Sequence, residues 1–167
     1  MKIFREVISF MFNKILLPMD GSIQAEKAGE YALTSADSFG ADIIVLYVVD
    51  TYYLNSKLST LWVNPLPEPD LTRQSEKELR AEGKNAVESF KNKLEETQCG
   101  GKCKNVNIIT MIKEGKPADV ILETINEEGV DSVVMGKSSK HGIDKFLLGS
   151  TTEKVVKEAK IPVHVIP

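Results

Sequence analysis

Residues 135–157, MGKSSKHGIDKFLLGSTTEKVVK, decide how this chain is interpreted. A short apolar run ends at Gly136, a polar loop containing Gly142 follows, and Gly149 and Ser150 open an amphipathic helix. Glycine lets backbone N–H groups come close to a ligand, and the first N–H groups of a helix lie at the positive end of its dipole without intrahelical partners. The stretch therefore predicts either an anion site or a surface loop whose glycines only make turns.

Apolar runs and helical patterns alternate along the rest of the chain. Strands are predicted at residues 14–19, 43–49, 106–112, 131–135 and 161–166. Five strands separated by helices imply right-handed crossovers and a doubly wound, mostly parallel α/β sheet. Such sheets bind ligands beyond the carboxyl ends of the strands, where the strand order reverses. If strands one and four are neighbours there, residues 18–20 and 136–150 would meet in one crevice.

The helices between these strands have recognisable starts. Ser22 is predicted to cap the first helix, which Gly40 ends, and Ser75-x-x-Glu78 and Ser150-x-x-Glu153 read as capping boxes. A further helix follows Gly115-Lys116-Pro117, with proline near its first position. Apolar spacing predicts the inward side chains, which include Ala28, Tyr31, Ala32 and Phe39 in the first helix and Val155, Val156 and Ala159 in the last.

Composition excludes several classes of protein. A chain of 167 residues fits one domain, and a net charge of −3 argues against nucleic acid as a partner. No apolar run is long enough to span a membrane, and the first residues lack a cleavage signal, so we expect a cytoplasmic protein. The C-x3-C pair Cys99 and Cys103 is expected to be two free thiols, because a metal would need further ligands and a disulfide is disfavoured in the cytoplasm. Residues 51–75, with three prolines and several aromatic side chains, fit either a binding segment or an irregular excursion packed on its own domain.

The chain resembles the universal stress protein family from Met11 onward. The matching pieces are KILLPMDGS (14–22), DIIVLYVVD (42–50), EGKPADVI (114–121), DSVVMGKS (131–138), LLGSTTEKVV (147–156) and IPVHVI (161–166). The resemblance implies a Rossmann-like five-stranded parallel sheet of order 3-2-1-4-5, formed by residues 11–167 behind an N-terminal extension, 1–10. The family's ATP-binding pattern, G-x2-G-x9-G-[S/T], stands here as Gly136-x2-Ser139-x9-Gly149-Ser150.

Ser139 is the departure from that pattern. A non-glycine residue would cost about 1 kcal/mol if the position needs a positive φ, and its Cβ would lie where backbone meets phosphate. Its hydroxyl could instead donate a hydrogen bond to a phosphate oxygen. The departure weakens the inference of nucleotide binding without removing it.

The resemblance also implies a set of residues along an adenine nucleotide, ATP or AMP, with Mg²⁺ held through the phosphates if a metal is present. The set has three groups, which lie at the adenosine side, near the ribose and at the phosphates. In that order the groups are Pro18, Asp20 and Val48 (the last through its backbone, at the adenine); Met135 and Gly136; and Ser139, Gly149, Ser150 and Thr151.

The function predicted from these residues is a nucleotide-binding regulatory protein. Neither a Walker A motif nor a nucleophile–base set is present, so we expect no catalytic residues, although Asp20 with a divalent ion leaves slow ATP hydrolysis open. The alternatives are a nucleotide-free interaction module, which Ser139 favours, and a phospho-acceptor receiver, disfavoured because strand three ends in Lys113-Glu114. A homodimer through residues 161–166 is expected, since this apolar strand would be an uncovered sheet edge.

Overall fold

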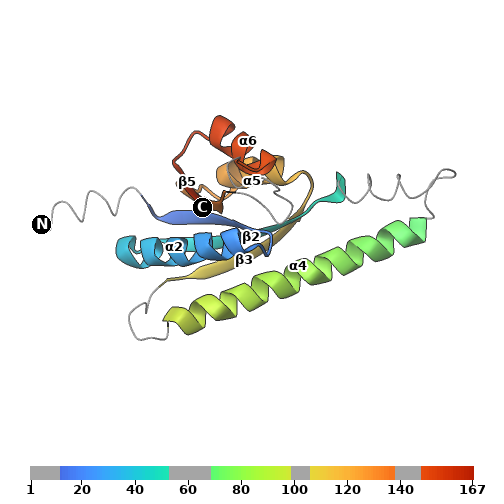
Figure 1. The fold of residues 1–167 in the computed structure, drawn as a ribbon, viewed down its shortest axis with the longest axis horizontal. Coiled ribbons are helices and arrows are strands. Elements are labelled where there is room, and N and C mark those ends of the chain that lie inside the picture. Colours follow the sequence, from blue (N-terminus) through green and yellow to red (C-terminus); the bar gives the residue numbers. More distant parts are fainter. Residues whose placement is uncertain (1–11, 53–68, 99–105, 138–147) are drawn as a thin grey trace, which may run out of the picture.

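The computed structural model describes residues 12–52, 69–98, 106–137 and 148–167. Five parallel strands form one sheet in the order β3-β2-β1-β4-β5, as predicted (Figure 1). The order reverses between β1 and β4, so these two strands flank the switch point. The elements are β1 (Lys14–Met19), α2 (Ile23–Phe39), β2 (Asp42–Val49), α4 (Pro69–Gln98), β3 (Ile108–Glu114), α5 (Pro117–Glu127), β4 (Ser132–Gly136), α6 (Ser150–Glu158) and β5 (Val163–Ile166).

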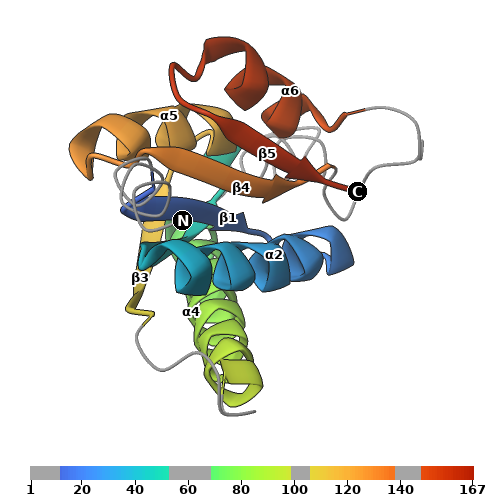
Figure 2. The same ribbon diagram turned by 90° about the vertical axis from the view of Figure 1, so that its left-hand side faces the viewer.

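Helices cover both faces of the sheet. Figure 2 shows α2 and α4 on one side of the strands and α5 and α6 on the other. Successive residues of a strand point to opposite faces, and in β1 Ile15 and Leu17 join the cluster under α2 and α4, whereas Leu16 joins the cluster under α5 and α6. All three are at most 1% exposed, which is the two-sided burial expected of a central parallel strand.

The amino ends of β1 and β4 are joined by one carboxylate. Asp131 accepts hydrogen bonds from the backbone N–H of Asn13 at 2.7 Å and of Lys14 at 3.2 Å. The Lys14 ammonium in turn donates to the carbonyl of Glu128 at 2.7 Å. These contacts fix β1 against β4 at the edge opposite the predicted crevice.

Two helix starts differ from the predictions. The helix α4 begins at Pro69, six residues before the predicted Ser75, because a proline in the first turn loses no helical hydrogen bond. The N-cap of α6 is Gly149 and not Ser150, and glycine has no side chain with which to cap the helix. The capping box predicted at Ser150-x-x-Glu153 is therefore wrong, because Ser150 is already the first helical residue.

Two side chains predicted to face inward are exposed. Tyr31 is 46% exposed, because the inward stripe of α2 is formed by small residues such as Ala28 and Ala32 and by Leu33. Val156 is 42% exposed, whereas its neighbour Val155 is fully buried. Adjacent helical residues point about 100° apart, and in α6 the direction of Val155 leads into the core whereas that of Val156 leads to solvent.

Candidate functional site

The pairing of β1 with β4 ends near a proline at the carboxyl end of β1. β1 pairs with β2 over six residue pairs, from Lys14–Asp42 to Met19–Tyr47, but its pairs with β4 are Ile15–Ser132 and Leu16–Val133. The even-numbered residues of β1 face β4, since the N–H of Asp131 donates to the Lys14 carbonyl, and Pro18, two residues after Leu16, has no N–H to donate on that side. The proline therefore cannot extend the β1–β4 ladder, and the pairing of these two strands ends at the switch point.

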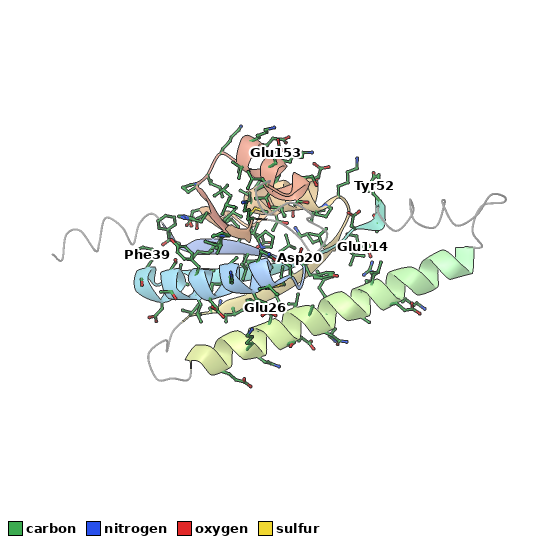
Figure 3. All side chains as sticks on the ribbon, in the orientation of Figure 1. Asp20, Glu26, Phe39, Tyr52, Glu114 and Glu153 are labelled. Carbon is green, nitrogen blue, oxygen red and sulfur yellow. The ribbon has the colours of Figure 1, made fainter. Side chains whose placement is uncertain are left out.

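Asp20 lies directly after β1 and shapes the turn into α2 (Figure 3). Its Oδ1 accepts the N–H of Ser22 at 2.9 Å, and Gly21 between them has φ of 73°. Ser22 then caps α2 as predicted, because its Oγ accepts the N–H of Ala25 at 3.1 Å. The carboxylate thus has the turn role that is common for aspartate in an Asp-Gly-Ser sequence, and this turn holds it at the carboxyl edge of the sheet.

Gly136, the last residue of β4, packs against the first turn of α2. A Cβ added at this position would lie 2.9 Å from the carbonyl carbon and Cβ of Gln24 and 3.1 Å from the nitrogen of Ala25. On the other side, the hydroxyl of Thr152 in α6 donates to the Gly136 carbonyl at 3.0 Å. The amino-terminal turns of two helices therefore meet at this one residue.

Lys137 joins the end of β4 to both α6 and β5. Its carbonyl accepts the N–H of Gly149, the N-cap of α6, at 2.9 Å. Its own N–H donates to the carbonyl of Ile166 in β5 at 2.7 Å. The beginning of α6 is thus held next to the carboxyl ends of β4 and β5.

The first turn of α6 presents backbone N–H groups at this place. The first intrahelical bond is donated by Glu153 to the Gly149 carbonyl at 2.8 Å, so the N–H groups of Ser150, Thr151 and Thr152 precede the helical ladder. Ser150 is exposed and Thr151 is half-buried. This arrangement supplies donors and a positive dipole end to an anion.

Two lysines balance the carboxylates around α6. Lys154 donates to Asp119 of α5, and this bond lowers the pKa of the Asp119 carboxyl and raises the pKa of the lysine. Lys157 donates to Glu153 at 2.5 Å and lowers the pKa of that carboxyl. Since each carboxylate has a lysine partner, the negative charge next to the first turn of α6 is offset.

The remaining predicted residues lie at the same edge or in the core. Val48, near the end of β2, is half-buried and pairs with Lys113 of β3. Met135 is 4% exposed and belongs to the core cluster under α5 and α6, so packing in the core is sufficient to explain a methionine at this position. Ser139 lies outside the described residues, as do His141, Gly142, both cysteines and residues 1–10.

The contacts of Thr152, Gln24 and Lys137 were not predicted from the sequence. A polar side chain in the first turn of a helix ordinarily faces solvent, and Thr152 differs because its hydroxyl has an acceptor in β4. The available signal was the run of three hydroxyl residues, 150–152, after a glycine. That run does not reveal which hydroxyl turns inward.

The sequence and the fold are both similar to those of known proteins. Residues 11–167 match the model of the universal stress protein family. The chain belongs to this family. Universal stress protein MJ0531 of Methanocaldococcus jannaschii is 33% identical over 159 residues, which cover 93% of this chain and 82% of that protein. The structure of UspA from Lactobacillus plantarum superposes with a TM-score of 0.73 at 26% identity and covers 93% of this chain and 98% of its own.

Two more distant universal stress proteins share the fold and were solved with adenine nucleotides. One, from Arabidopsis thaliana with AMP bound, has a TM-score of 0.58 at 23% identity, over 92% of this chain and 90% of its own. The other, in complex with cAMP, has a TM-score of 0.61 at 17% identity, over 93% and 97%. Within the four described stretches of the present chain, no helix has the length and apolar character needed to cross a membrane.

Proposed function

We propose that this universal stress protein binds an adenine nucleotide, ATP or AMP, beyond the carboxyl ends of β1 and β4. The observation that carries the proposal is the meeting of two helix N-termini at Gly136, next to the point where Pro18 stops the β1–β4 ladder. In this proposal the phosphates contact Gly149, Ser150 and Thr151, together with Ser139. The adenosine lies toward Pro18, Asp20 and the Val48 backbone.

Adenine is proposed as the base because two universal stress proteins of this fold hold AMP and cAMP. ATP is added because three of the four positions of the family's ATP pattern are present in this chain. Mg²⁺ would be held through the phosphate oxygens, which are hard ligands of the kind that this ion prefers. Binding then stabilises one conformation or assembly, and the role is regulatory, with at most slow hydrolysis.

The test is calorimetric titration of the protein with ATP, AMP and GTP in the presence of magnesium. We expect heat and saturation with both adenine nucleotides and much weaker binding of GTP. Nucleotide released from freshly purified, denatured protein should absorb at the adenine maximum. No heat and no thermal shift at millimolar ligand would contradict the proposal and leave the nucleotide-free interaction module.

We also propose that the protein is a cytoplasmic homodimer that pairs through β5. The N–H groups of Val133 and Lys137 donate to the carbonyls of Pro162 and Ile166, so the even-numbered residues of this strand face β4. Parallel pairing uses alternate residues, and the N–H groups of Val163 and Val165 therefore point away from the sheet. All four residues of β5 are only half-buried, so a second copy could add a strand at this edge.

A further inference from the structure

Thr152 is a buried hydroxyl residue at the beginning of a surface helix. Only 3% of it is exposed, and its hydroxyl donates to the carbonyl of Gly136 at 3.0 Å. Buried hydroxyl groups in native proteins are nearly always hydrogen-bonded, and this one donates its single proton to the Gly136 carbonyl of the sheet. Its side chain therefore has no proton left to donate to a ligand.

The acceptor of this bond is held rigidly. Gly136 is aligned with Ile166 of β5, and the first turn of α2 lies so close that no Cβ would fit. The peptide group that carries this carbonyl is also held from its other side, because its N–H, that of Lys137, donates to the Ile166 carbonyl at 2.7 Å. Since this peptide group lies between β5 and the first turn of α2, the Thr152 bond joins α6 to a fixed part of the sheet.

The first turn of α6 has two tethers at this end. One is the backbone bond from the Gly149 N–H to the Lys137 carbonyl, at the cap itself, and the other is the Thr152 side chain, three residues further along. One bond alone would fix only the position of the helix end, whereas two bonds at different residues also fix the direction of the helix. The direction in which the N–H groups of Ser150 and Thr151 point thus depends on the Thr152 hydroxyl.

We propose that Thr152 is a positioning residue for the phosphate groups of the bound nucleotide. This inference rests on the function proposed above. Thr152 touches no phosphate but aims the first turn of α6 at them, and its one bond toward the ribose side is to the backbone of Gly136. Its effect should therefore appear mainly in the affinity gained from the phosphates and much less in the affinity for the nucleoside.

The experiment compares ATP with adenosine, by calorimetry, in the parent chain and in three variants. Thr152→Val keeps the shape and removes the hydroxyl, Thr152→Ser keeps the hydroxyl, and Thr152→Ala removes it without placing a methyl group against the carbonyl. The matched control is Thr34→Val, because the Thr34 hydroxyl also donates to a helix carbonyl, that of Glu30 at 3.0 Å, on the exposed side of α2.

We expect Thr152→Val and Thr152→Ala to lose about three- to tenfold in the ratio of ATP to adenosine affinity, which is the range of one hydrogen bond. Thr152→Ser and Thr34→Val should keep the ratio of the parent. Circular dichroism checks folding, and if the valine variant does not fold, the alanine and serine variants decide. A parent chain that binds ATP, with an unchanged ratio in the folded Thr152 variants, would overturn the positioning role alone.

Two other outcomes also count against it. Equal loss of ATP and adenosine affinity would show that Thr152 only supports the fold. A parent chain that binds neither ligand would refute the proposed function, and this inference with it.

Discussion

Replacing Gly136 with alanine should destabilise the protein through crowding alone. The new Cβ would lie 2.9 Å from the carbonyl carbon of Gln24 and 3.1 Å from the nitrogen of Ala25, and these backbone atoms cannot rotate away as a side chain can. The φ of Gly136 is not positive, so no backbone strain is added. Overpacking of this kind costs about 1–3 kcal/mol of unfolding free energy. For a domain of this size that lowers Tm by roughly 2–12 °C.

The matched control is Gly40→Ala. Gly40 has φ of 72° and nothing within 4 Å of an added Cβ, so its variant measures left-handed backbone strain without crowding. That strain costs about 1 kcal/mol. Thermal and urea unfolding of the parent and both variants give the comparison. If Gly136→Ala is as stable as the parent while Gly40→Ala is destabilised, the close packing of α2 on β4 is wrong.

Three further predictions concern the loop, the sheet edge and the charges on α6. Gly149 has φ of −61° and ψ of 148°, which any residue adopts, so Gly149→Val should fold but bind ATP at least about tenfold more weakly in calorimetry; normal binding would mean that the phosphate site is misplaced. Val163→Pro removes a donor that points away from β4, so sedimentation should show a monomer where the parent is a dimer, and a parent that is monomeric at high micromolar concentration would refute the dimer. Lys154→Met should return the lowered pKa of the Asp119 carboxyl toward 3.8, as followed by NMR, and an unmoved pKa would refute the ion pair. Because this pKa is lowered in the folded state, the pair stabilises the protein at pH values above the ordinary pKa. Its contribution is lost as the pH falls through the lowered pKa of the folded state.

The sheet was predictable because its central strands, β1, β2 and β4, are buried on both faces. Continuous apolar runs such as residues 43–49 indicate a parallel sheet without further information. The caps at Ser22 and Gly40 were equally clear, since each is a local interaction between a residue and its own helix. The strand order came from the family resemblance and could not be derived from periodicity, because the order depends on contacts between distant segments.

Tertiary contacts explain both the error at Tyr31 and the contact of Gly136 that was not predicted. Tyr31 fits the apolar spacing of α2, but its ring lies beside that of His164, with centroids 6.0 Å apart, at the half-covered border of the sheet. Gly136 was predicted for its approach to a ligand, whereas the structure gives it a second reason, the first turn of α2. Neither contact leaves a pattern in the sequence, since the partners are far apart along the chain.

The position of the nucleotide is the central claim, and a titration of ¹⁵N-labelled protein with ATP and magnesium tests it most directly. We expect one set of amide signals to shift together and to saturate at one ATP concentration: those of Gly136, Gly149, Ser150 and Thr151. The amide signals of the residues directly after Asp20 should shift over the same concentration range. AMP should move the signals near Asp20 and Val48 with smaller changes at Ser150 and Thr151. Saturating shifts that cluster on another face, or an unchanged spectrum at millimolar ATP, would contradict the account.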